Sequence, residues 1–181
     1  ICTDVSHLNL DECAAPERIA GVKLETVPSR DGKLNVNELE DLMIRKGDQH
    51  FSSPGLISIT QPTELGTVYT LKELSDIRAF ASRHELLIHV DGARLSNCLI
   101  ALDCSFEDIV QTLKPDAISF GGTKNGLLGV EAVLLFDDQR IRNFKLIRKQ
   151  NMQLPSKSLF LAAQFEAYFE DGLYLEIARH S

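Results

Sequence analysis

The most informative segment of the chain is Ala117-Ile118-Ser119-Phe120-Gly121-Gly122-Thr123-Lys124-Asn125-Gly126. Its first four residues are mainly apolar, which is typical of a strand inside a protein. The two glycines that follow allow the backbone to turn tightly and to approach a ligand closely. The turn then presents a single lysine, Lys124. The stretch therefore predicts a buried strand that ends at a ligand-facing lysine.

A second strand upstream also ends in polar residues. Leu86–Val90 is an almost continuous apolar run, typical of a parallel strand covered on both faces, and Asp91 and Arg94 follow it. Ligands of parallel sheets bind outside the carboxyl ends of the strands, so Asp91 and Lys124 are expected to meet there. A lysine and a carboxylate at such an edge suit pyridoxal phosphate. A solvated loop lysine and a turn aspartate are the alternatives that spacing alone leaves open.

The rest of the chain alternates strands and helices. Further strands are predicted at Val22–Val27, Leu56–Thr60 and Val130–Phe136. The lysine loop is too short for a helical crossover, so the last of these is expected to run antiparallel to its neighbour. Helix starts are predicted at Asn35, Thr70 and Ser105, each with an acid three residues later, and further helices at Asp137–Lys149 and Ser158–Arg179. The pattern predicts an α/β fold with three αβα layers and a mostly parallel sheet.

Composition narrows the class of protein. The 181 residues are enough for one domain with a sizeable core. The net charge of -7 argues against a nucleic-acid partner, because such binders normally carry a basic stripe. No apolar run reaches membrane-spanning length, so no membrane association is expected. The four cysteines form no Cys-x-x-Cys pair, which predicts no metal site and a reducing, cytoplasmic location.

The two ends of the sequence suggest whether the chain is a whole protein or a part of one. It begins at Ile1 without an initiator methionine or a signal peptide, and it stops at Ser181 without a helix cap or a closing element. We therefore expect the chain to be an internal piece of a longer protein.

Four blocks in chain order carry a resemblance to a known family. They are Ser6-His7 to Pro16, Ile59-Thr-Gln-Pro-Thr-Glu64-Leu-Gly-Thr-Val-Tyr, His89-Val-Asp91-Gly-Ala-Arg94-Leu and Ser119-Phe-Gly-Gly-Thr-Lys124-Asn-Gly. Together they resemble the low-specificity L-threonine aldolases, which belong to the β-eliminating lyases of fold type I. The resemblance covers nearly the whole chain. It implies that 1–181 is part of the large, cofactor-binding domain, without the family's N-terminal segment and C-terminal small domain.

The resemblance implies pyridoxal 5′-phosphate as the cofactor and assigns roles around it. Lys124 matches the lysine that bonds to the cofactor, and Asp91 matches the acid that keeps the pyridine nitrogen protonated. Arg94 matches an arginine that contacts the substrate carboxylate or the ring oxygen. The corresponding alternatives are a surface lysine, a strand-end cap and an ordinary salt bridge.

Four further residues complete the implied site. His7 matches a histidine that stacks on the pyridine ring and serves in proton transfer. Glu64 stands where one branch of the family has a histidine acting on the β-hydroxyl, and a second branch has an acid; a structural acid is the alternative. Thr123 and Lys149 are expected to contact the cofactor phosphate. The segment around Lys149 departs from the common pattern at Asn151, which replaces a glycine.

The implied reaction is retro-aldol cleavage of threonine or allo-threonine to glycine and an aldehyde. Another fold type I β-eliminating lyase or a racemase would share Lys124 and Asp91 and differ in the base, and a non-catalytic fragment or a simple binding module is the remaining alternative. The resemblance implies an amino-acid substrate and a homodimer or homotetramer with sites at subunit interfaces. The chain by itself is expected to be inactive, because the family's main phosphate-binding turn and a carboxylate-binding arginine lie outside it.

Overall fold

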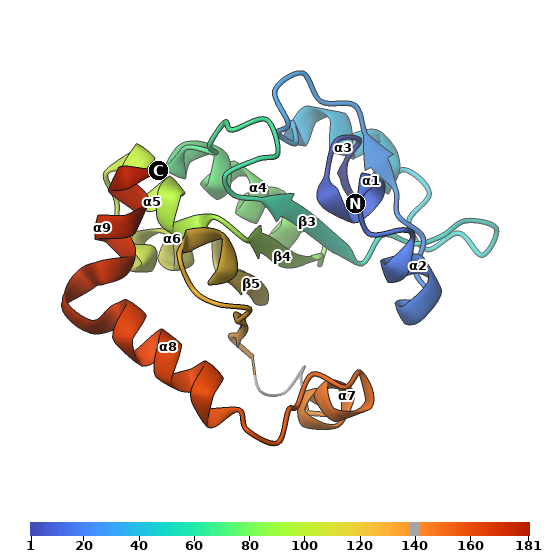
Figure 1. Ribbon diagram of the computed structural model, residues 1–181. Coiled ribbons are helices and arrows are strands. Elements are labelled where there is room, and N and C mark those ends of the chain that lie inside the picture. Colours follow the sequence, from blue (N-terminus) through green and yellow to red (C-terminus); the bar gives the residue numbers. More distant parts are fainter. Residues whose placement is uncertain (138–141) are drawn as a thin grey trace.

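A mostly parallel sheet forms the centre of the computed structural model, which describes residues 1–137 and 142–181 (Figure 1). The strand order is β3-β4-β5-β6. β3, β4 and β5 are parallel to one another, and β6 is antiparallel to β5, as predicted. The strands are β3 (Leu56–Thr60), β4 (Leu87–Gly92), β5 (Ala117–Gly121) and β6 (Glu131–Leu135). β4 continues past its predicted end at Val90, so Asp91 is a strand residue.

A separate, short parallel pair of strands lies beside the β3 edge of this sheet. β1 (Cys2–Thr3) pairs with β2 (Thr26–Val27). The terminal amine of Ile1 donates to the Leu56 carbonyl and the Ser58 N–H donates to the Ile1 carbonyl, both at 2.8 Å, so the start of the chain lies beside β3. The predicted strand Val22–Val27 is wrong over its first four residues. Only its last two residues meet a partner strand, because β1 is itself two residues long.

The predicted helix starts are confirmed by their capping contacts. The Asn35 side chain caps α3 (Val36–Met43) by accepting from the Asn37 N–H at 3.1 Å. Reciprocal capping boxes open α4 (Leu71–Arg83), through Thr70 and Glu73, and α6 (Phe106–Leu113), through Ser105 and Asp108. Such caps satisfy backbone N–H groups that a helix leaves unpaired at its start.

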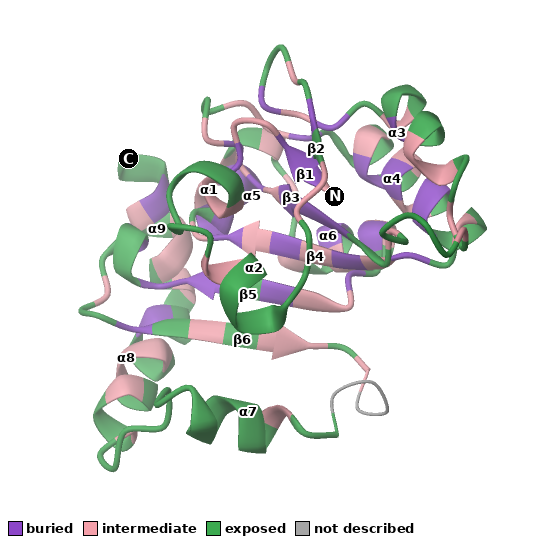
Figure 2. Ribbon diagram, turned by 90° about the vertical axis from the view of Figure 1, so that its right-hand side faces the viewer, coloured by how far each residue is buried: buried purple, intermediate pink, exposed green. Residues whose placement is uncertain are grey.

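The two faces of the sheet differ in character, because side chains alternate along each strand. One face is apolar and fully buried, and its members are Ile57, Ile59, Ile88, Val90, Ile118 and Phe120. They belong to the same core as the buried stripes of α4 and α6. The opposite face carries Ser58, His89 and Ser119. Helix α2 (Ala15–Ala20) lies on that side in both views and has no buried residue (Figures 1 and 2). The predicted α/β class with a mostly parallel sheet is confirmed.

The C-terminal helices differ from their predictions. The expected helix Ser158–Arg179 is wrong as a single element, because Asp171 and Gly172 have φ values of +50° and +74°. This left-handed backbone ends one helix and starts the next. The resulting elements are α8 (Leu159–Phe169), a 3₁₀ turn (Glu170–Gly172) and α9 (Leu173–His180).

The other expected helix, Asp137–Lys149, is shorter than predicted. It lies partly on residues 138–141, outside the described residues, and α7 (Phe144–Gln150) begins only after a turn. Helices α1 (His7–Leu10), α2 and α5 (Leu95–Leu102) have no counterpart among the predictions. Across the two described ranges, no helix has the length and apolar character that crossing a membrane requires.

Candidate active site

The predicted site residues lie where parallel strands end. β1, β3, β4 and β5 run in one direction, so their carboxyl ends form one edge of the sheet. His7 follows β1, Glu64 follows β3, Asp91 is near the end of β4, and Lys124 follows β5. Figure 2 shows β4 and β5 pointing the same way and β6 the opposite way. Topology therefore brings residues 117 positions apart in sequence, His7 and Lys124, to the same edge.

Glu64 has one engaged and one unengaged oxygen. Its Oε1 accepts from the backbone N–H of His7 at 2.8 Å and from the Thr60 hydroxyl at 2.7 Å. Its Oε2 is buried and has no hydrogen-bond partner within the described part of the chain, and the same is true of the hydroxyl of Ser6 next to His7. Buried polar atoms are normally paired, so an unpaired acceptor here indicates a place for a ligand group or water. Two bonds to Oε1 fix the direction in which Oε2 points.

The side chain of His7 is partly exposed to solvent. Its exposed fraction is 42%, and its Nδ1 lies 2.8 Å from the carboxylate of Glu12. This contact orients the imidazole ring from the solvent side. The backbone N–H of His7 donates to Glu64, so the start of α1 is held next to the Glu64 carboxylate.

Asp91 is half-buried and anchored through both backbone and side chain. Its Oδ1 accepts from the Ala93 N–H at 3.0 Å, and its carbonyl accepts from the Gln61 N–H at 2.9 Å. The neighbouring strand approaches closely: a Cβ on Gly121 would lie 2.0 Å from the Ala93 carbonyl oxygen. Only glycine fits there, which explains the first glycine of the lysine loop. Arg94 is exposed at the start of α5.

Lys124 is presented by a short 3₁₀ turn, Thr123–Asn125. The carboxylate of Glu131 holds the turn by accepting from the N–H groups of Gly122 and Thr123, at 3.0 and 3.2 Å. On the other side, the buried side chain of Asn125 donates to the Tyr168 hydroxyl. Lys124 itself is exposed, and within residues 1–137 and 142–181 its ammonium group has no hydrogen bond or ion pair. A fixed turn therefore carries an unengaged amine.

Thr123 and Lys149 are placed less favourably for a phosphate. The Thr123 hydroxyl donates to the Val130 carbonyl at 3.4 Å, and its backbone N–H is engaged by Glu131. Lys149 is exposed on α7, which has no buried residue and lies beyond β6, away from β3 and β4 (Figures 1 and 2). The structure does not bring Lys149 to the other candidates, and both phosphate contacts stay predictions.

A polar row crosses the sheet beside Asp91 and has no counterpart among the sequence predictions. His89 lies between the hydroxyls of Ser58 and Ser119, with Nδ1 and Nε2 at 2.8 and 2.9 Å from them. Burial lowers the pKa of His89, and the negative charge of Asp91 opposes that shift. A neutral imidazole donates from one nitrogen and accepts at the other, which suits a hydroxyl on each side. The signal in the sequence is a histidine in the middle of an apolar strand.

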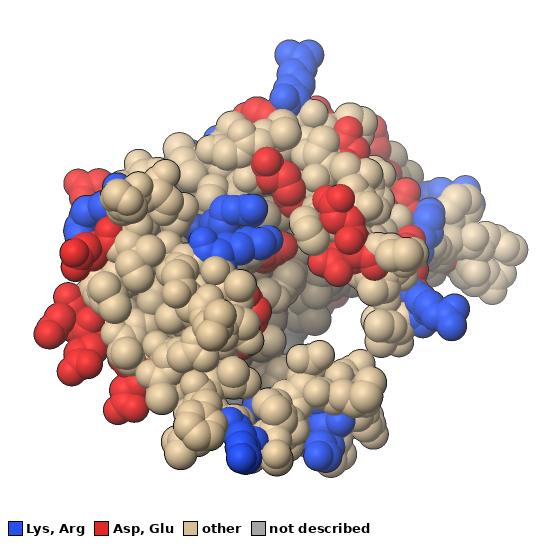
Figure 3. Space-filling model, in the orientation of Figure 1, with Lys and Arg blue, Asp and Glu red and all other residues tan. Residues whose placement is uncertain are grey.

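Other groups near the edge do not form a metal site. The residues that the structure describes contain no group of three or more His, Cys, Asp or Glu side chains that could hold an ion. Burial raises the pKa of Cys98 to about 12, so this thiol stays protonated at neutral pH. Figure 3 shows acidic and basic side chains interspersed on the face it presents.

Comparisons with known proteins agree with this geometry. The model of the family described as Beta-eliminating lyase matches residues 1–176. A low specificity L-threonine aldolase from Pseudomonas sp. (strain NCIMB 10558) is 38% identical over 182 residues, covering 100% of this chain and 53% of the relative. The enzyme of that name from Pseudomonas aeruginosa shows the same identity and coverage. The solved structure of a threonine aldolase from Leishmania major superposes with a TM-score of 0.89 at 32% identity, covering 99% of this chain and 52% of that one. The chain spans about half the length of the curated relatives it matches.

Proposed function

The chain belongs to the beta-eliminating lyase family, and from that premise we propose that it carries part of the active site of a pyridoxal phosphate-dependent lyase. The proposed reaction cleaves threonine or allo-threonine, which are β-hydroxy-α-amino acids, to glycine and acetaldehyde. The observation that carries this choice is the buried, unpaired Oε2 of Glu64 at the strand edge that also holds Asp91 and Lys124. It offers a hydroxyl-bearing substrate an acceptor that a simple α-amino acid would leave unused.

Pyridoxal 5′-phosphate fits the residues at this edge. The unengaged amine of Lys124 would hold the cofactor covalently, and the anchored carboxylate of Asp91 would face its pyridine nitrogen. Phosphate contacts from Thr123 and Lys149 have less support, because the Thr123 hydroxyl is engaged and Lys149 lies on α7. The phosphate is then held mainly by residues outside this chain.

Each residue at the edge has a separate task in the proposed reaction. The bound cofactor supplies an acceptor for the electron pair released when the Cα–Cβ bond breaks. The negative charge of Asp91 keeps the ring nitrogen protonated, because an adjacent anion favours the charged form of a base. Arg94 binds the substrate carboxylate with charge-assisted hydrogen bonds. These contacts hold the substrate and maintain the charge that the bond cleavage needs.

Proton transfer falls to the residues on the β1 and β3 sides. Glu64 takes the proton of the substrate β-hydroxyl at Oε2, while its two contacts at Oε1 keep the carboxylate in place. His7 would contact the cofactor ring and pass protons, with its imidazole oriented by Glu12. The amine of Lys124, when not bonded to the cofactor, would also move protons.

The assembly we propose is a cytoplasmic homodimer or homotetramer. Helix α8 exposes large apolar side chains, with Leu159 at 76% and Phe160 at 68%. Contiguous apolar surface of this kind marks an interaction site. A second subunit, or the remainder of the protein, would cover it and complete the site.

Product analysis tests the proposed function. The complete protein, loaded with pyridoxal phosphate, should convert threonine to glycine and acetaldehyde in equal amounts. Faster pyruvate formation from serine or cysteine would identify a different β-eliminating lyase, and racemisation of an amino acid would identify a racemase. Absence of any reaction despite cofactor binding would leave a binding module.

The role of Glu64 is tested in the same assay. Glu64→Gln should lower kcat by about 10²-fold or more, because general-base catalysis contributes on that scale. Glu38→Gln, at an exposed position in the first turn of α3, is the matched control and should have no effect. An unchanged rate for Glu64→Gln would return the proton transfer to His7 or to a water.

A further inference from the structure

Gln61 follows the last residue of β3 and is almost completely buried, with 1% of its surface exposed. It stands three residues before Glu64, at the start of the loop that leads to α4. A buried amide needs partners for both its donor and its acceptor atoms. The positions of these partners show which segments the side chain of Gln61 connects.

The side chain of Gln61 closes the loop on itself. Its Oε1 accepts from the N–H of Tyr69 at 2.9 Å, and its Nε2 donates to the carbonyl of Tyr69 at 3.0 Å. Gln61 and Tyr69 are thus joined by two bonds at the two ends of the loop that contains Glu64. An amide provides the required donor and acceptor together, which an ionised carboxylate does not.

Gln61 also connects the loop to the other side of the site. Its backbone N–H donates to the carbonyl of Asp91 at 2.9 Å. Its Nε2 lies 2.9 Å from the sulfur of Cys98 on α5, the helix that follows Arg94. One residue therefore contacts the loop of Glu64, the strand of Asp91 and the helix next to Arg94.

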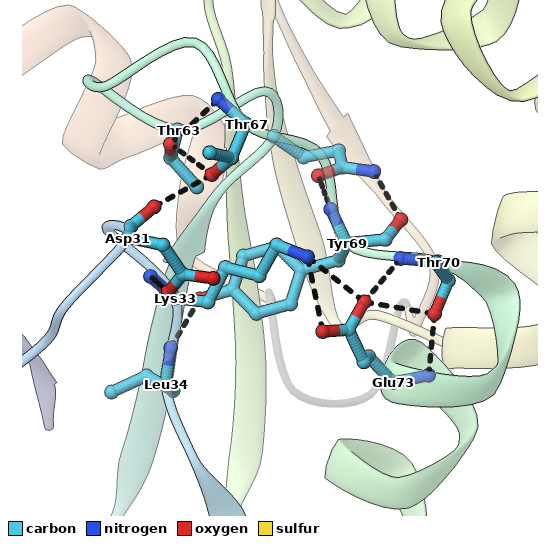
Figure 4. Close-up of polar contacts among 9 residues, drawn as sticks. Asp31, Lys33, Leu34, Thr63, Thr67, Tyr69, Thr70 and Glu73 are labelled. Atoms are coloured by element: carbon cyan, nitrogen blue, oxygen red, sulfur yellow. Dashed lines mark hydrogen bonds and ion pairs between the residues drawn. The ribbon is translucent and has the colours of Figure 1, made fainter.

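The far side of the loop is fixed independently (Figure 4). The hydroxyls of Thr63 and Thr67 lie 2.8 Å apart, and Thr67 donates to the carbonyl of Asp31 at 2.6 Å. The Tyr69 hydroxyl accepts from the N–H of Leu34 at 2.6 Å. The outer contacts hold the loop against residues 31–34, while the amide of Gln61 joins the two ends of the loop to each other and to Cys98 on α5.

We propose that Gln61 is a positioning residue whose amide holds the loop of Glu64 closed, so that the Glu64 carboxylate meets the substrate hydroxyl in the reactive geometry. This inference rests on the proposed function. It acts through the loop and assigns Gln61 no contact with substrate or cofactor. Loss of the amide should therefore affect the chemical step more than binding.

The first measurement compares Gln61→Met with Gln111→Met in the complete protein. Methionine keeps the side-chain volume and removes both hydrogen-bonding ends, while Gln111 is exposed on α6 and serves as the matched control. Gln61→Met should lower kcat for threonine cleavage by about 10²-fold, the scale expected when a reacting group is misplaced by about 1 Å. KM and the absorbance of the bound cofactor should stay close to the wild type. Equal effects of the two variants would overturn the inference.

A double-mutant cycle shows whether Gln61 acts through Glu64. In a Glu64→Gln background, Gln61→Met should change kcat by no more than about twofold, because residues acting in one unit are not additive. The same loss in both backgrounds would mean that Gln61 acts elsewhere, and the inference would fail.

Rescue by pH separates the amide's hydrogen bonds from its bulk. A protonated carboxyl accepts at one oxygen and donates from the other, so Gln61→Glu reproduces the contacts to Tyr69 only when protonated. Its rate relative to the wild type at each pH should rise as the pH falls, while the relative rate of Gln61→Met stays flat. A ratio for Gln61→Glu that stays as low as that of Gln61→Met at every pH would contradict the role of the amide.

Hydrogen exchange distinguishes failure of this inference from failure of the proposed function. If the complete wild-type protein does not cleave threonine, the proposed function fails, and exchange of the Thr63 and Gly66 amides still reports on the loop. These amides donate to the Thr67 and Thr63 carbonyls at 2.8 and 2.9 Å. Gln61→Met should speed their exchange, whereas Gln111→Met should not. Unchanged exchange in Gln61→Met would overturn the positioning role whatever the reaction is.

Discussion

Helices α4 and α8 are similar in length, but their apolar residues differ in how far they are buried. α4 buries Leu74, Ile77, Phe80 and Ala81 in the core on one side of the sheet. α8 is the more apolar helix, and it buries only Tyr168 while Phe169 remains 50% exposed. The apolar residues of α4 lie on one stripe, and those of α8 are distributed around the helix. A stripe finds a partner within the chain, whereas an all-round apolar helix needs surfaces on several sides.

The same contrast separates the two parts of the candidate site. Asp91 lies on a strand of the packed sheet, and Glu64 and Lys124 lie within four residues of the ends of β3 and β5. Lys149 lies on α7, which buries no residue. We expect function to depend on the packed strand ends and to be less sensitive to substitutions in the exposed region between α7 and α8.

The largest expected effect is at Lys124. Lys124→Ala should lower turnover by several orders of magnitude, because covalent catalysis by the lysine is lost. Lys157→Ala, at an exposed position between α7 and α8, should leave turnover close to wild type. Borohydride reduction of the loaded complete protein, followed by peptide mapping, should locate the cofactor on Lys124. A label on Lys149 would instead show that the cofactor binds in the exposed region at α7 and not at the packed strand ends.

Asp91 should give the next largest effect. Asp91→Asn should lower kcat by about 10²-fold or more while cofactor stays bound, because each unit of pKa lost at the ring nitrogen corresponds to about 1.4 kcal/mol. Asp76→Asn, in an exposed ion pair with Lys72 on α4, is the control and should be neutral. The assay is threonine cleavage together with the absorbance of the bound cofactor. Near-normal turnover of Asp91→Asn would mean that Asp91 serves only to hold the end of the strand in place.

Unfolding free energies test the comparison of α4 and α8 directly. Ile77→Ala should destabilise the chain by about 2–5 kcal/mol, because it leaves a cavity in the core. Phe160→Ala should change stability by about 0.5 kcal/mol or less, as exposed positions normally do. Urea unfolding of the 181-residue chain gives both values. A cost at Phe160 as large as that at Ile77 would show that α8 is already covered in the 181-residue chain, for example by a second copy, without the remainder of the protein.

The smallest expected effect concerns His89 and pH. Burial lowers its folded-state pKa below the ordinary 6.5, so the folded chain binds fewer protons there than the unfolded chain. Stability should therefore fall as the pH drops below about 6.5, with a slope of at most about 1.4 kcal/mol per unit. His89→Asn should flatten this slope below about pH 6.5. The exposed His50→Asn is the control, and an equal slope in His89→Asn and wild type would contradict the assignment.

Local signals in the sequence were sufficient to predict several of the strands and helices. β3, the capping boxes of α4 and α6, and the antiparallel turn into β6 are as expected. These features depend on residues within a few positions of one another. The position of Asp91 and Lys124 at one edge also follows from the sequence, because parallel strands bring their carboxyl ends together.

The ends of other strands and helices depended on tertiary contacts and backbone conformations that the hydrophobic periodicity does not reveal. Only two residues of the expected strand Val22–Val27 pair, because their partner β1 is short. The expected helix over 158–179 is divided at Gly172, a residue that the apolar pattern alone passes over. Helix α5 has apolar residues on most sides, so its sequence carries no clear helical stripe.

The sequence alone was enough to predict the order of strands β3 to β6 along the chain, the starts of the capped helices and the residue types that follow each strand, since all of these depend on short-range chemistry. Tertiary structure alone decided which oxygen of Glu64 is engaged, which serines flank His89, and that the amide of Gln61 reaches Tyr69 and Cys98. The partner of a buried polar atom depends on which distant segment packs beside it. A hydrogen bond extends about 3 Å, so only the folded arrangement of the sheet could select these partners.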